Sequence, residues 1–211
     1  MTVKATSLLS LLAIWVAMIP AVIASPGAWW ALIFAFLASG AVGIGAWRSL
    51  GISRLMAVTA VWAATGVAIA AHTDAAWISI FSFVSTGAIV YSAMRRTAVL
   101  LGLGIAAAWL TTGTVIAAAD DAGPTWVSIF AFLTAGAVAN KRRGQVAGLA
   151  AIVWWAAAGA IMLATDGWYW LAVLAFLFSS ASLGFGDGGF RIPRHFEWDL
   201  FRGDDEGEAV R

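Results

Sequence analysis

The chain has 211 residues, of which 62% are hydrophobic and only 11% are charged, and its formal net charge is +1. A soluble domain carries about a quarter charged residues, so this composition excludes an ordinary water-soluble protein. The sequence contains no cysteine, which excludes disulfides, thiolate metal sites and cysteine nucleophiles.

Eight apolar stretches follow one another along the chain, each with roughly the 20 residues that a helix needs to cross a bilayer. They cover residues 6–24, 27–47, 54–71, 75–94, 98–118, 125–140, 145–165 and 168–184. Inside hydrocarbon every backbone N–H and C=O must be bonded within the protein, and a helix meets this requirement within one segment. The sequence therefore predicts an all-α fold, a polytopic membrane helix bundle with eight transmembrane helices.

The stretches repeat in pairs, and tryptophan marks the repeat. Each odd-numbered stretch has a tryptophan, at spacings of 47, 47 and 46 residues: Trp15, Trp62, Trp109 and Trp155. A glycine follows four residues later in the last three, whereas Ile19 holds this place in the first. The even-numbered stretches share the pattern Trp-x3-Phe-x-Phe-x3-Gly, which begins at Trp30, Trp77 and Trp126 and is degenerate from Trp170.

Self-similarity at a fixed period indicates tandem duplication. We expect four like-oriented helical hairpins in a compact bundle, at about residues 6–47, 54–94, 98–140 and 145–184. Together they form a transmembrane domain over residues 1–184. The first stretch has some features of a signal peptide, but it carries the repeat, and we therefore assign it to the body of the protein.

The order of a first-helix tryptophan, a turn, a second tryptophan and closing small residues resembles that of the SPW-repeat membrane proteins. In that family a proline follows the first tryptophan, and the best local match here runs from Trp15 to Pro20. The Ser-Pro-Trp signature itself is absent, and Val67, Thr114 and Ala160 stand at the proline position in the later hairpins. The resemblance implies the hairpin architecture and no particular activity.

Charged residues alternate between the two sides of the expected membrane. One side has the basic residues Lys4, Arg48, Arg54, Arg95, Arg96, Lys141, Arg142 and Arg143, and the other has Asp74, Asp120, Asp121 and Asp166. Basic residues favour the cytoplasmic side. The pattern predicts a multi-pass protein of the cell membrane with both termini in the cytoplasm and four short external turns.

The tryptophans suggest two kinds of role. Those that open the even stretches, together with Trp29, Trp168 and Tyr169, are typical of an aromatic belt at the headgroup level. The four odd-stretch tryptophans should lie near mid-bilayer, where the glycine four residues on shares their face and lets helices approach closely. We expect helix packing there. The alternative is a cage for a lipophilic ligand such as a carotenoid or quinone, formed by Trp15, Trp62, Trp109 and Trp155.

The distribution of ionisable residues bears on function. None lies well inside an expected span, although such residues mark ion and proton paths in transporters. The only lysines, Lys4 and Lys141, exclude a mid-helix retinal Schiff base. We expect His72 to be a solvated turn residue, and we assign no catalytic residues, metal ligands or cofactor. The sequence predicts a protein that is not an enzyme.

The last segment, residues 185–211, is expected to be a cytoplasmic tail with a glycine-rich linker, a short amphipathic segment and an acidic end. Ile192, Phe196 and Leu200 recur at helical spacing, which is typical of a short surface helix. We expect this helix to lie against the headgroups or the protein's own cytoplasmic loops, and the alternative is that the three residues dock onto a partner. We interpret the chain as an accessory, scaffold or assembly component that binds another membrane protein or itself as a homo-oligomer, and not nucleic acid. The alternatives are a carrier or channel for an uncharged or lipophilic small molecule, or a binder of a lipophilic pigment or quinone.

Overall fold

The computed structural model describes residues 3–45, 51–91, 99–121, 123–139, 144–165 and 167–184. This part of the chain is helical and contains no strand. The α-helices are α1 (Val3–Ala24), α2 (Ala31–Gly45), α3 (Ile52–Ala71), α4 (Ile78–Tyr91), α5 (Val99–Ala118), α6 (Val127–Ala139), α7 (Gly144–Thr165) and α8 (Leu171–Gly184). Short 3-10 helices precede three of the even helices: η1 (Pro26–Ala28), η3 (Thr73–Trp77) and η5 (Gly123–Trp126).

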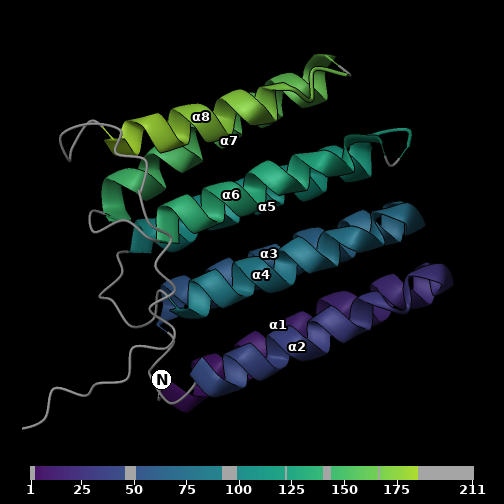
Figure 1. The fold of residues 1–211 in the computed structure, drawn as a ribbon. Coiled ribbons are helices and arrows are strands. Elements are labelled where there is room, and N and C mark those ends of the chain that lie inside the picture. Colours follow the sequence, from purple (N-terminus) through teal and green to yellow (C-terminus); the bar gives the residue numbers. More distant parts are fainter. Residues whose placement is uncertain are drawn as a thin grey trace, which may run out of the picture.

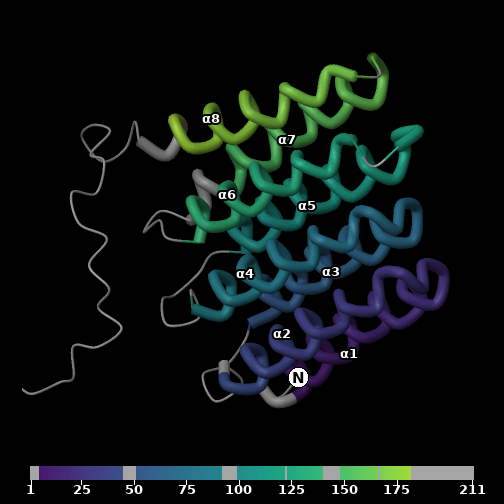
Figure 2. Tube along the Cα trace, turned by 45° about the vertical axis from the view of Figure 1, so that its right-hand side comes forward, coloured from purple at the N-terminus to yellow at the C-terminus, as the bar shows by residue number. Residues whose placement is uncertain are grey.

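The helices form four hairpins that lie side by side in chain order (Figure 1). The odd helices α1, α3, α5 and α7 pack against one another in one layer, and the even helices form a second layer over them. The view turned by 45° shows the same order, with α1 and α2 at one end and α7 and α8 at the other (Figure 2). The arrangement is thus an open two-layer row, where the sequence had led us to expect a compact bundle.

The odd helices all run in the same direction. Along α3 and α5, Gly102 lies against Ser53 and Gly113 against Ala64. From the first contact to the second, the chain advances 11 residues along α5, from Gly102 to Gly113, and 11 residues along α3, from Ser53 to Ala64. The two helices are therefore parallel. The turns between the helices of each hairpin therefore gather at one end of the molecule, as Figure 1 shows.

Five helical segments are long and apolar enough to cross a membrane: Ala5–Ala24, Ile52–Ala71, Thr73–Tyr91, Val99–Ala118 and Gly148–Thr165. Helices α2, α6 and α8 are apolar but shorter. They begin later than the sequence suggested, because the residues around each opening tryptophan form a 3-10 helix or a turn. Helix length and composition thus support a multi-pass membrane protein.

A tryptophan stands immediately before each even helix. Three of them meet the phenylalanine four residues later edge-on, with ring centroids 5.4–6.1 Å apart and interplanar angles of 77–85°: Trp30 with Phe34, Trp77 with Phe81 and Trp126 with Phe130. Edge-to-face geometry is favourable for aromatic rings. The repeated Trp-x3-Phe spacing therefore packs the residue before each of these helices against the first turn of the helix.

Candidate functional site

The contacts between hairpins are built from the repeated glycines. An added Cβ at Gly66 would lie 2.6 Å from the Ala17 carbonyl oxygen, and one at Gly113 would lie 2.7 Å from Ala64 Cα. Gly159 meets Thr111 in the same way. In each case the glycine of one odd helix receives the backbone or side chain of the preceding odd helix. Close approach of this kind strengthens van der Waals packing between helices in a membrane.

The odd-helix tryptophans lie inside this packing. Trp62, Trp109 and Trp155 are fully buried, whereas Trp15, in the first hairpin, is only partly buried. The Trp62 indole N–H donates to Thr86 Oγ1 at 2.9 Å, and the Trp155 indole N–H donates to Thr134 Oγ1 at 3.0 Å. Both bonds join the odd layer to the even layer.

The third buried indole lacks such a bond. In the described part of the chain, Trp109 Nε1 and Ser85 Oγ are both buried without a hydrogen-bond partner. Aligning the hairpins places Ala135 where Thr86 accepts from Trp62. Alanine has no acceptor on its side chain, so Trp109 cannot bond within its own hairpin as Trp62 does.

Hydroxyl groups on α4 continue this polar contact between the layers. Ser82 Oγ and Thr65 Oγ1 are 2.5 Å apart, and both also bond backbone carbonyl oxygens one helical turn earlier. Ser79, Ser82, Ser85 and Thr86 are all buried. Hydroxyls that bond neighbouring helices and the carbonyls of their own helix are common in membrane bundles. Within the described residues we find no group of three or more His, Asp or Glu that could hold a metal ion.

Phenylalanines connect the even helices from one hairpin to the next. The ring pairs are Phe34 with Phe83, Phe81 with Phe132, and Phe130 with Phe176, at centroid distances of 5.7–6.3 Å. Each pair joins the first phenylalanine of one Trp-x3-Phe-x-Phe pattern to the second phenylalanine of the next. The row is thus held by one repeated contact in each layer.

Neighbouring hairpins have a third kind of contact, a hydrogen bond from a side chain in the turn, in addition to the glycine contacts and the phenylalanine pairs. Ser25 Oγ donates to the Ile69 carbonyl oxygen at 2.8 Å. His72 stands at the equivalent place one repeat later, and its Nε2 lies 3.1 Å from the carbonyl oxygens of Ile116 and Ala119. Because both neighbours are acceptors, Nε2 must carry the proton. The expectation of a solvated turn histidine is therefore wrong: His72 is partly buried and bonds the last turn of α5.

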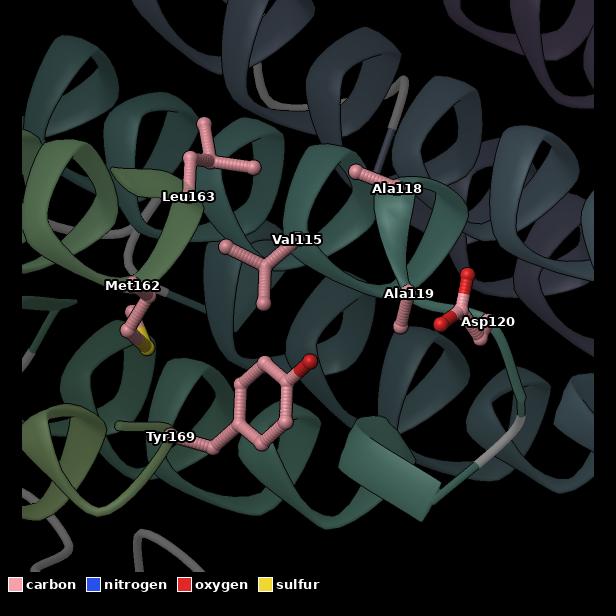
Figure 3. A pocket seen from close by; sticks show the side chains of 7 residues that line it. All are labelled: Val115, Ala118, Ala119, Asp120, Met162, Leu163 and Tyr169. Carbon is pink, nitrogen blue, oxygen red and sulfur yellow. The ribbon is translucent and has the colours of Figure 1, made fainter. Parts of the chain in front are cut away.

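These bridges serve helix ends. The last four carbonyl groups of a helix have no partner inside it, and Ile69 and Ile116 belong to the last four residues of α3 and α5. A side chain in the turn of one hairpin thus bonds a free carbonyl group at the end of the next odd helix. At the following junction the equivalent residue is Ala119, which has no side-chain donor, and a cavity of about 90 Å³ lies there. Figure 3 shows the side chains around it.

The remaining candidate residues have different surroundings. Trp29, Trp168 and Trp170 at the turns are exposed, and Trp168 and Trp170 lie beside each other with ring centroids 5.9 Å apart. Trp30, Trp77 and Trp126 are instead partly buried against the core, and the aromatic belt stays a prediction. The tail candidates Ile192, Phe196 and Leu200 lie outside the described residues.

Comparison of the chain with protein-family models, with curated proteins and with solved structures gave no match. The resemblance to SPW-repeat proteins therefore stays a prediction from the sequence.

Proposed function

We propose that the chain is a non-enzymatic membrane protein of eight transmembrane helices that serves as an accessory, scaffold or assembly component of a membrane complex. This proposal rests on the contacts that the repeated residues make. The odd-helix glycines, most of the repeated phenylalanines and three of the mid-helix tryptophans are engaged in contacts between helices of the chain itself. A protein whose repeated features serve its own packing is suited to present a fixed surface to partners.

The proposal of eight spans rests on the common direction of the odd helices. The odd helices are long enough to cross and lie parallel in one layer. Between two spans of the same direction the chain has to return across the membrane, which supports spans formed by α2, α4 and α6. α8 packs along α7, which supports the eighth span. The charge alternation then favours cytoplasmic termini and the cell membrane.

The alternative functions also have structural support that can be tested. The buried hydroxyls on α4 and the unpaired indole of Trp109 are polar groups within the row, as a path or site for an uncharged solute requires. A carotenoid or quinone would need room beside Trp62, Trp109 or Trp155, and the full burial of these three side chains favours packing.

The decisive experiment is purification from native membranes in mild detergent. The full chain is compared with a form truncated after Gly186, which lacks the proposed docking residues of the tail. Under the scaffold proposal the full chain brings down a defined set of membrane proteins, the truncated form loses part of that set, and both run as monodisperse particles. Identical partner sets would remove the docking role of the tail.

Absorbance spectra of the same samples test the ligand alternatives. A stoichiometric chromophore or quinone that is lost in Trp109→Phe would contradict the scaffold proposal and support a lipophilic-ligand binder. The absence of any reproducible partner, together with uptake of an uncharged solute into vesicles that contain the protein, would instead support a carrier or channel.

A further inference from the structure

The cavity between the third and fourth hairpins has a mixed lining. Its walls come from the end of α5, the end of α7 and the turn before α8: Val115, Ala118, Ala119, Asp120, Met162, Leu163 and Tyr169. Figure 3 shows the Tyr169 hydroxyl on the side of its ring that faces Ala119 and Asp120. A volume of about 90 Å³ has room for about three water molecules at roughly 30 Å³ each, or for one small organic group of a few heavy atoms.

The position of this cavity within the repeat indicates what is missing. At the two preceding junctions a donor from the turn, Ser25 or His72, bonds the carbonyl of Ile69 or Ile116. The carbonyl at the equivalent place in α7 belongs to Met162, which lines the cavity. Ala119 supplies no side-chain donor to it. A ligand with its own N–H or O–H would supply the donor that Ala119 lacks.

The electrostatics favour a cation. Both α5 and α7 end at the cavity, with their last residues at Ala118 and Thr165, and helix C-termini carry negative partial charge. Asp120 adds a carboxylate to the lining. The nearby Asp121 carboxylate accepts from the Gly123 N–H at 2.7 Å, and His72 bonds the carbonyl oxygens of Ile116 and Ala119 at the α5 end. The ring of Tyr169 is a further wall that suits a positive charge.

From this geometry we propose that the cavity binds a primary ammonium group on a short carbon chain. The ammonium donates hydrogen bonds to the Asp120 carboxylate and to the carbonyl end of α7, and its methylene groups contact Val115 and Leu163. A bare Ca²⁺ or Mg²⁺ ion would require about six oxygen ligands, whereas the lining side chains offer one carboxylate, from Asp120, and one hydroxyl, from Tyr169. The proposal does not depend on the scaffold function.

Two sources carry this chemistry: the ethanolamine headgroup of a phospholipid and a free small amine. The cavity lies at the end of the apolar spans, beside the exposed aromatic rings of Trp168 and Trp170, where a headgroup can reach it. The test uses the full chain in nanodiscs of phosphatidylcholine, followed by thermal unfolding. Either ethanolamine chloride is added, or phosphatidylethanolamine replaces part of the lipid. Choline chloride at equal concentration is the matched control, because its nitrogen has no N–H.

We expect ethanolamine to raise the unfolding temperature in a saturable way and choline to leave it unchanged. Asp120→Asn should weaken the apparent affinity roughly tenfold, as expected for loss of one charge-assisted hydrogen bond. Ala119→His, which provides the missing donor from the chain, should abolish the response. A response to the phospholipid alone assigns the site to a lipid headgroup, and a response to the free amine alone assigns it to a soluble amine.

Equal responses to ethanolamine and choline would overturn the proposal, as would the absence of a response to either source. An ethanolamine response that persists unchanged in Asp120→Asn would also overturn it. This last measurement decides the question even if the histidine variant does not fold.

Discussion

The contact between α3 and α5 predicts opposite effects for two glycines of the same hairpin. An added Cβ at Gly113 would lie 2.7 Å from Ala64 Cα and Cβ and 2.9 Å from its carbonyl oxygen. These are mostly backbone atoms, which cannot move aside separately. Overpacking costs about 1–3 kcal/mol and the better helix propensity of alanine returns up to about 1 kcal/mol, so Gly113→Ala should lower the free energy of unfolding by roughly 1–2 kcal/mol.

Gly136, on α6, is the matched control. Nothing lies within 4 Å of a Cβ added there, so only helix propensity acts, and Gly136→Ala should raise the free energy of unfolding by up to about 1 kcal/mol. Both variants keep every tryptophan, and unfolding in mild detergent can therefore be followed by the same fluorescence signal. Stabilisation by both changes would show that α3 and α5 do not approach so closely, and destabilisation by both would show an unseen contact at Gly136.

Three further predictions concern the indole bonds, the turn bridge and the topology. Trp62→Phe should cost about 1 kcal/mol more than Trp109→Phe in unfolding assays, because only the first change removes an indole hydrogen bond; equal costs would contradict this assignment. Ala119→His should raise the free energy of unfolding by about 1 kcal/mol through a new bridge, and Ala119→Leu, which fills space without a donor, should not match it. Single cysteines at Arg95 and Asp120 should react with an impermeant thiol reagent in intact cells at position 120 only, and labelling at 95 would reverse the orientation.

Much of the architecture could be predicted because the repeat is visible in single residues. The regular spacing of the odd-stretch tryptophans indicated four hairpins of like orientation, and Trp62 with Gly66 on one face indicated close helix approach. Periodicity reports which residues are equivalent and which face they share. It does not report how equivalent units pack, and the open two-layer row emerged only in the structure.

The turn bridges could not be predicted for a different reason. Ser25 and His72 occupy equivalent positions but differ in chemistry, so no shared residue type marks the position. Their acceptors are backbone carbonyls 44 residues further along the chain, which have no signature in the sequence. The cavity at the third junction is harder still to predict, because it follows from the substitution of a donor by Ala119.

The departures from the repeat have a physical explanation at the two ends of the row. Ile19 replaces the glycine in the only odd helix that receives no preceding hairpin, and its side chain is 48% exposed. Leu174 replaces the phenylalanine that would reach a fifth hairpin. Thr165, equivalent to Ser25 and His72, donates to the carbonyl of Ile161 in its own helix at 2.7 Å.

Terminal units of repeat proteins commonly differ from internal ones because one of their faces is not covered by a neighbour. Here the substitution also prevents extension of the row. An isoleucine side chain at position 19 fills the space that the backbone of a preceding odd helix would need, as Ala17 needs it at Gly66. Another hairpin therefore cannot pack on α1 as hairpins pack inside the row. If two copies of the chain associate, they must do so through a contact of a different kind.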